Sequence, residues 1–287
     1  LRREKFYERG SLHWPSSFIE MGQRVFREYT AGSERKVVHK TYSWLIQRPD
    51  VARKVGLVSD KDGYVVGVRK VIEADGTVRY GRTCALCHST VDEEKNRLDG
   101  IPNTSLDIGL LLKLRNDFDP KVSRHLSPGK GTLEERILWG PGRMEVTADY
   151  VFNPVSTPVL RGIRYNRYLH WSGGVEQVNI AALAIRIETL MMLWGAKKKR
   201  KSRPSRELVF ALAMYMSSLD PLTVPNTEHR GGLAAFAKAK CDTCHHLPNY
   251  SGSDLSTADV VGTKAAASEA IARGTGAYRV PALTDLD

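Results

Sequence analysis

Two five-residue segments of the same pattern constrain this chain more than any other feature of its sequence. Each holds two cysteines three positions apart with a histidine directly after the second, at 84–88 and again at 241–245. Thiols at this spacing can join the two vinyl groups of a porphyrin as thioethers, and the adjacent imidazole can bind its iron. We therefore predict two covalently bound c-type haems. The predicted attachment residues are Cys84, Cys87, Cys241 and Cys244, and the predicted proximal iron ligands are His88 and His245.

A cysteine pair of this spacing also occurs in dithiol redox switches and in halves of zinc sites. The two pairs here lie in distant parts of the chain, unlike those of a zinc ribbon, and a redox switch needs no following histidine. The chain contains 4 cysteines, and all belong to the two segments, so no disulfide is expected within it. Because haem of this kind is attached outside the cytoplasm, we expect a periplasmic or otherwise extracytoplasmic protein.

The charge balance of the chain is strongly basic. Its 287 residues carry a formal net charge of +11, part of which the haem propionates would offset. No nucleic-acid recognition motif accompanies this charge, so we expect no nucleic-acid partner and instead an acidic redox partner protein. No apolar run approaches the roughly 20 residues that span a bilayer, which predicts no transmembrane segment. No signal peptide is visible at residues 1–4, so Leu1 is expected to lie within or after a processed leader.

The hydrophobic pattern predicts a mainly α-helical protein with long loops and one small β-hairpin. The alternating runs 64–71 and 77–80 flank a turn signal at 74–76, which places the hairpin directly before the first cysteine pair. Residues 1–30 lack firm periodicity and are expected to form an extended arm or a broken helix. Helices are predicted at 42–55, 108–114 and 178–194, after a capping Ser205, and through Leu233 and Phe236 before the second pair; Met191 and Met192 are expected to be core residues.

The order of these motifs resembles the bacterial di-haem cytochrome c peroxidase superfamily, which includes rubber-oxygenase-like members. Besides the two cysteine motifs, the resemblance is carried by the runs 157–162, 212–221, 261–263 and 278–283, and by His170 with Gly173. It implies two cytochrome-c-like haem domains packed face to face, at 1–222 and 223–287. The second domain is short for an independent unit, so we expect further polypeptide or a neighbouring protein to complete it.

The sixth ligands of the two irons are harder to assign. The resemblance brings the segment of His170 back over the first haem and so predicts His170 as its sixth ligand, with Met144 as the rival. For the second haem, no methionine follows Cys241, and His246 is too close to His245 to reach the opposite face of the same porphyrin. Three options stay open: a ligand from the first domain such as His39, His125 or His229, a ligand from further polypeptide or a partner, or an open iron.

Three functions are compatible with these sequence features. Electron transfer needs no catalytic residue beyond the iron ligands, and we expect it to be the primary role. A di-haem peroxidase or oxygenase with one open iron is the alternative, but it needs an acid/base group beside that iron, and no acid follows His170. A docking subunit of a larger redox complex, with the basic segment 197–201 as its contact, is a third interpretation.

Overall fold

The computed structural model describes residues 16–31, 33–34, 36–118, 137–144, 153–194, 203–221, 230–270 and 274–283, and it is rich in helices. The α-helices are α1 (Ser16–Glu28), α2 (Lys36–Ile46), α3 (Pro49–Lys54), α4 (Ala85–His88), α5 (Ile108–Phe118), α8 (Ile180–Trp194), α9 (Arg206–Ser218) and α10 (Arg230–Lys238). Short 3-10 helices are η2 (Ile163–Tyr165), η3 (Cys241–Thr243) and η4 (Ala265–Ala267).

The strands of this part of the chain form antiparallel pairs and no larger sheet. The pairs are β1 (Val68–Ile72) with β2 (Val78–Arg82), β3 (Ser89–Val91) with β4 (Arg97–Asp99), β5 (Arg143–Met144) with β6 (Val155–Ser156), β7 (Tyr168–Leu169) with β8 (Val175–Glu176), and β9 (Leu255–Thr257) with β10 (Ala277–Arg279). The helix-rich architecture with long loops agrees with the mainly α prediction, and the strand pairs serve to fasten loops together.

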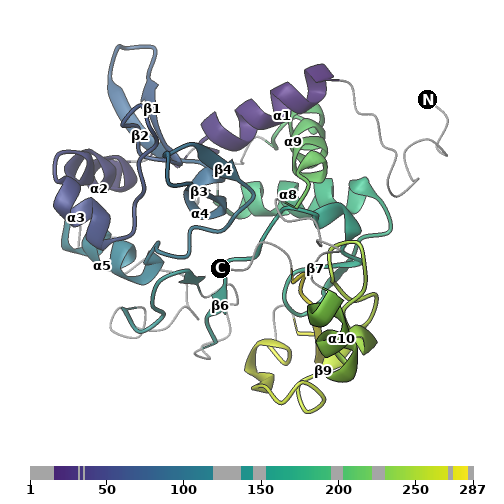
Figure 1. Ribbon diagram of the computed structural model, residues 1–287. Helices are drawn as coiled ribbons and strands as arrows, with labels where there is room; N and C mark the ends of the chain where they lie inside the picture. The colour runs from purple at the N-terminus through teal and green to yellow at the C-terminus, as the bar shows by residue number, and fades with distance from the viewer. Residues whose placement is uncertain are drawn as a thin grey trace.

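Helices α1 and α9 pack against each other in the larger part of the molecule (Figure 1). Gly22 permits the close approach, because a Cβ atom there would lie 2.1 Å from the carbonyl oxygen of Ala211. Phe26 is fully buried in this contact, with its ring edge-on to that of Tyr215 at a centroid distance of 5.6 Å. The expectation of an extended arm or broken helix is therefore wrong for residues 16–28, where packing on α9 stabilises a regular helix despite the internal glycine.

Helices α8 and α9 confirm the predictions from hydrophobic spacing. Ser205 caps α9 by accepting a hydrogen bond from the Leu208 amide at 3.2 Å. Met191 is buried in the same core cluster as α9, as predicted. Met192 is 40% exposed, so the expectation that it belongs to the core is wrong: it lies on the outer face of the helix.

The predicted hairpin before the first cysteine pair is confirmed. Strands β1 and β2 pair in register from Val68 with Arg82 to Ile72 with Val78. The chain then runs directly into α4, which carries the first motif. Gly67 precedes the hairpin at φ +76°, and a Cβ atom there would lie 2.0 Å from the Leu86 amide nitrogen. Only glycine fits between the hairpin and the motif helix.

Helix α4 lies where two hydrophobic clusters meet. Ala85 belongs to the cluster of α1, α8 and α9, whereas the adjacent Leu86 belongs to the cluster built by α2, α3 and α5. The helix predicted at 42–55 is instead two helices, because Pro49 begins α3 after a break at Arg48. The helix predicted at 108–114 is confirmed as α5.

Residues 230–270 and 274–283 form the part that carries the second motif, at one end of the molecule (Figure 1). Helix α10 confirms the predicted helix through Leu233 and Phe236. Strands β9 and β10 pair from Leu255 with Arg279 to Thr257 with Ala277. The predicted boundary near 222 lies outside the described residues. None of the helices placed by the structure is long and apolar enough to cross a membrane.

Candidate functional site

The first motif supplies one thiol from Cys84, directly before α4, and one from Cys87, within α4. Both are free, and neither is fully exposed to solvent. Burial raises the pKa of Cys84 to about 12, with a smaller contribution from the neighbouring Cys87. Burial also raises the pKa of Cys87 to about 11, although the Arg82 guanidinium opposes this shift. Both are therefore neutral thiols at pH 7, in a largely apolar site.

His88 is oriented by a backbone carbonyl. Its Nδ1 lies 3.3 Å from the carbonyl oxygen of Pro158. A carbonyl can only accept, so Nδ1 carries the proton, which leaves the Nε2 lone pair available. Burial lowers the pKa of His88 to about 4, with the Pro158 contact acting in the opposite direction. His88 is therefore neutral at pH 7 with Nε2 free, which is the form of histidine that binds a metal.

A buried carboxylate, Asp99, anchors the residue next to His88. Asp99 accepts hydrogen bonds from the Ser89 hydroxyl at 2.8 Å, from Arg27 Nε at 2.6 Å and from the Tyr215 hydroxyl at 2.5 Å. The Gly100 amide also donates to the His88 carbonyl at 2.8 Å. The network connects the first motif to α1 through Arg27 and to α9 through Tyr215, and so holds it rigidly.

The second motif repeats the histidine orientation in a more open setting. His245 Nδ1 lies 2.7 Å from the carbonyl oxygen of Tyr250, so here too Nδ1 donates and Nε2 is left for a metal. Cys241 begins the 3-10 helix η3 and Cys244 follows it, and both are free and partly exposed. Leu233 and Leu247, which flank the motif in sequence, are 48% and 69% exposed.

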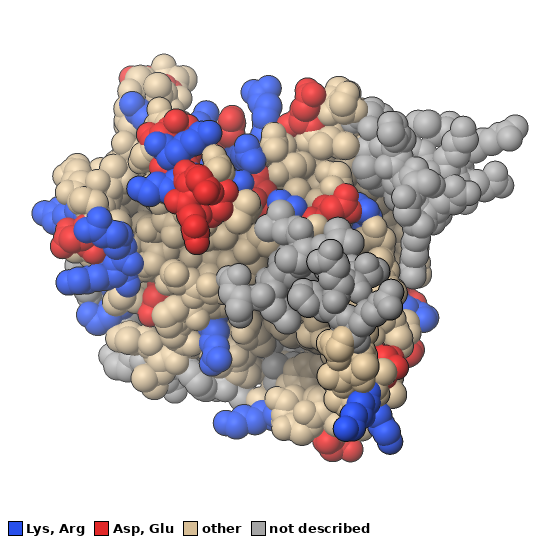
Figure 2. Space-filling model, viewed as in Figure 1, with Lys and Arg blue, Asp and Glu red and all other residues tan. Residues whose placement is uncertain are grey.

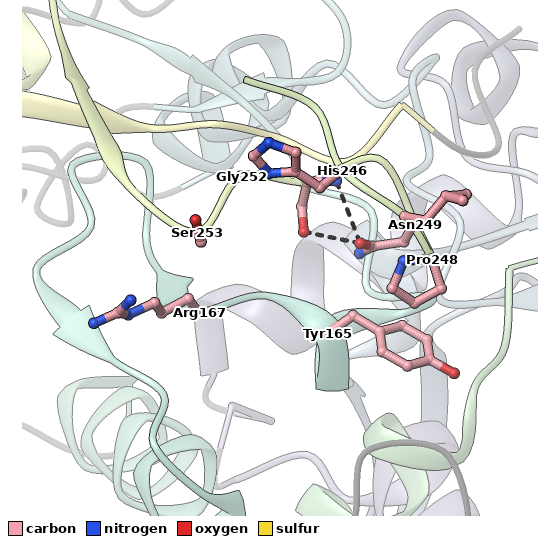
Figure 3. A pocket seen from close by; sticks show the side chains of 9 residues that line it. Tyr165, Arg167, His246, Pro248, Asn249, Gly252 and Ser253 are labelled. Atoms are coloured by element: carbon pink, nitrogen blue, oxygen red, sulfur yellow. Dashed lines mark hydrogen bonds between the residues drawn. The ribbon is translucent and has the colours of Figure 1, made fainter. Parts of the chain in front are cut away.

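A polar cavity of about 290 Å³ lies directly behind the second motif. Tyr165 and Arg167 line one side and His246 and Asn249 the other (Figure 3). Asn249 is fully buried and donates from Nδ2 to the Gly162 carbonyl at 3.2 Å. It also accepts a hydrogen bond from the Ser251 hydroxyl at 2.8 Å. The asparagine fastens the loop after His245 to the larger part of the molecule.

The structure places His170 in the turn after β7. It has φ +70°, and its Nδ1 lies 3.0 Å from the Ser172 hydroxyl. The next residue, Trp171, accepts a hydrogen bond from the Arg279 amide at 2.9 Å, which places the turn beside β10. The assignment of His170 to the first haem stays a prediction. Its rival Met144 packs against the cluster that also contacts Cys87.

The other candidate ligands divide into one structural residue and two outside the described part. His39 Nδ1 accepts a hydrogen bond from the Tyr80 amide at 3.2 Å, and the His39 ring stacks on the Tyr80 ring at a centroid distance of 5.9 Å. His39 therefore stabilises β2. His125 and His229 lie outside the described residues, as does the basic segment 197–201. Within the described ranges, no three His, Cys, Asp or Glu side chains gather in a way that could hold a metal ion by themselves.

The residues of both motifs suit a covalently held haem, because each offers two free thiols and a histidine with Nε2 available. Asp99, Ser89 and Tyr215 were not predicted from the sequence, since no local pattern connects residues so far apart.

Figure 2 shows basic and acidic side chains mixed over the visible face. No family model matches the chain, and no curated protein matches its sequence.

Proposed function

We propose that this protein is a di-haem c-type cytochrome of an extracytoplasmic compartment and that it transfers electrons. The observation that carries the proposal is shared by both motifs: a backbone carbonyl accepts from Nδ1 of the motif histidine and leaves Nε2 free. In a dithiol switch, this orientation would have no purpose. When bound, haem iron supplies one-electron redox chemistry whose potential depends on its axial ligands and surroundings.

The four cysteines and two histidines have defined roles in this proposal. Cys84, Cys87, Cys241 and Cys244 would hold the two porphyrins as thioethers, and His88 and His245 would bind the irons. The Asp99 network limits movement of His88 during a change of charge at the iron, because Ser89 is tied to two helices. A rigid ligand lowers the structural rearrangement that accompanies electron transfer.

The partner in this proposal is an acidic redox protein. The net charge of +11 would attract such a partner over a distance of about 10 Å at moderate ionic strength. The second motif is the more accessible of the two, since Leu233 and Leu247 beside it are exposed. We therefore expect electrons to enter or leave through the second haem.

One observation favours the alternative of a di-haem peroxidase or oxygenase. No methionine follows Cys241 in the sequence, and the His39 ring is engaged with β2, so neither a later methionine nor His39 is available as a sixth ligand of the second iron. A haem iron with an open position would be able to bind small oxidants, and peroxidase chemistry would also need a neighbouring acid/base group to move the proton.

Absorption and EPR spectra of the purified protein separate the two functions. Electron transfer predicts low-spin, six-coordinate iron at both haems and no turnover of hydrogen peroxide. A stable high-spin fraction together with peroxide turnover would overturn electron transfer as the primary role.

A further inference from the structure

Arg279, at the end of β10, is a buried cation whose partner is missing from the described residues. Only 9% of the residue is exposed. Its Nε is buried and makes no hydrogen bond within the described part of the chain, and no carboxylate of that part forms an ion pair with its guanidinium. Burying a charged group without a counter-charge is costly, so a site like this calls for an anion.

The Arg279 side chain is held in place by an aromatic neighbour. Its guanidinium carbon lies 5.3 Å from the centroid of the Trp171 ring, within the range of a cation–π contact. The Trp171 ring is itself fixed, because Nε1 donates to the Ser156 carbonyl at 2.8 Å. Burial lowers the pKa of Arg279 to about 10, so the side chain still carries its charge at pH 7.

Arg279 also lies close to two segments that we predict to take part in haem binding, the second motif and the turn that carries His170. The next residue, Val280, accepts a hydrogen bond from the Gly252 amide at 3.4 Å. A Cβ atom on Gly252 would lie 2.5 Å from the Val280 Cβ and 2.9 Å from the Cys244 carbonyl oxygen, so this strand end rests against the second motif. On its other side, Arg279 contacts Trp171, the neighbour of His170.

We propose that Arg279 and Trp171 form a carboxylate-binding site whose occupant is a haem propionate. This inference rests on the proposed function, because the propionates are the carboxylates that the two haems would bring. The planar guanidinium can hold a carboxylate through two parallel hydrogen bonds, which a lysine could not reproduce. The cation–π contact with Trp171 holds the guanidinium in place, and its N–H groups can then donate to the carboxylate.

The test compares reduction potentials of the haem-loaded protein with those of three variants. Arg279→Gln removes the buried cation, and Arg279→Lys keeps the charge without the fork. Arg167→Gln is the matched control, since this exposed arginine is paired with Glu176 in the same region. Intact mass confirms that both haems are attached in each protein, and EPR spectra confirm that iron ligation is unchanged.

The expected result is a lower reduction potential for one haem in Arg279→Gln, because a lost cation favours the more positive oxidised iron. The shift should exceed that of Arg167→Gln, and Arg279→Lys should lie between. The haem whose potential moves identifies which propionate is bound. Equal shifts in Arg279→Gln and Arg167→Gln, with both haems attached, would overturn this inference and leave the proposed function standing. A wild-type chain without covalent haem would overturn both.

A crystal structure of the haem-loaded wild-type protein tests whether Arg279 binds a propionate, even if Arg279→Gln fails to fold. We expect guanidinium nitrogen atoms of Arg279 within hydrogen-bond distance of a propionate oxygen. A guanidinium paired instead with a carboxylate of the protein itself, or turned toward solvent, would contradict the inference.

Discussion

The two cysteine motifs have the same pattern but different surroundings. The first lies on α4 between two hydrophobic clusters, and the Asp99 network ties it to α1 and α9. The second lies on a single 3-10 turn after α10, with exposed apolar residues around it. In both, a backbone carbonyl orients the histidine.

This difference separates what the motif determines from what the fold determines. The motif itself provides two thiols and an imidazole, and the fold provides the backbone carbonyl that orients the imidazole. The fold sets solvent access and rigidity, which together tune the potential of a bound haem. We therefore expect the first motif to be integral to folding and the second to be the point of exchange with partners.

The largest expected effect comes from removing one pair of thiols at a time. Cys84→Ser with Cys87→Ser, and Cys241→Ser with Cys244→Ser, should each abolish covalent attachment of one haem. The first double variant should also lower the melting temperature more, because α4 joins both core clusters. Thermal unfolding followed by circular dichroism measures this. Equal losses of stability would show that the two motifs are not embedded differently.

Breaking the Asp99 network should have the next largest effect. Asp99→Asn leaves Arg27 without its buried counter-charge, and we expect a loss of about 3 kcal/mol in the free energy of unfolding. Asp254→Asn is the matched control, because Asp254 is exposed, lies in the part that carries the second motif, and accepts a hydrogen bond from the Ser253 hydroxyl at 3.0 Å. Urea denaturation compares the two. A loss below about 0.5 kcal/mol for Asp99→Asn would contradict the anchoring role.

The pH dependence of stability should report on His88 in the haem-free chain. Its folded-state pKa of about 4 lies below the usual value of 6.5, because burial disfavours the imidazolium. The unfolded chain therefore takes up a proton first as the pH falls. Stability should be unaffected above pH 7 and decrease between about pH 6.5 and 4, by at most about 3 kcal/mol. Urea denaturation across this range should show a smaller decrease for His88→Asn; an identical decrease would contradict the assignment.

The smallest energetic effect, but a clear spectral one, is expected from His170→Ala. If His170 is the sixth ligand of the first haem, that haem becomes high-spin while the second is unchanged. Met144→Ala is the matched comparison. Each change can be made in the double-serine background of one motif, so that the spectrum belongs to a single haem. A high-spin shift in Met144→Ala alone would make Met144 the ligand.

Local sequence patterns predicted the elements that depend on neighbouring residues. The hairpin before Cys84, the capped helix after Ser205 and helix α10 all follow from spacing and turn residues. Helix α1 was missed because Gly22 weakens the local helical signal, and only its contact with Ala211 on α9 explains that glycine.

The parts of the sites that were missed depend on long-range contacts. Arg27 and Tyr215 meet Asp99 across 72 and 116 positions of sequence, and no local pattern could pair them. Arg279 and Trp171 are likewise far apart in the chain. The cysteine motifs were found because their chemistry is confined to five consecutive residues, whereas their environment is not.

Covalent attachment of two haems can be measured as the intact mass of the purified wild-type protein after extraction with acidified acetone. This treatment removes haem that is not covalently bound. We predict a chain that retains the mass of two haems, both lost together when all four cysteines are replaced by serine. A wild-type chain with the mass of the polypeptide alone would contradict this prediction.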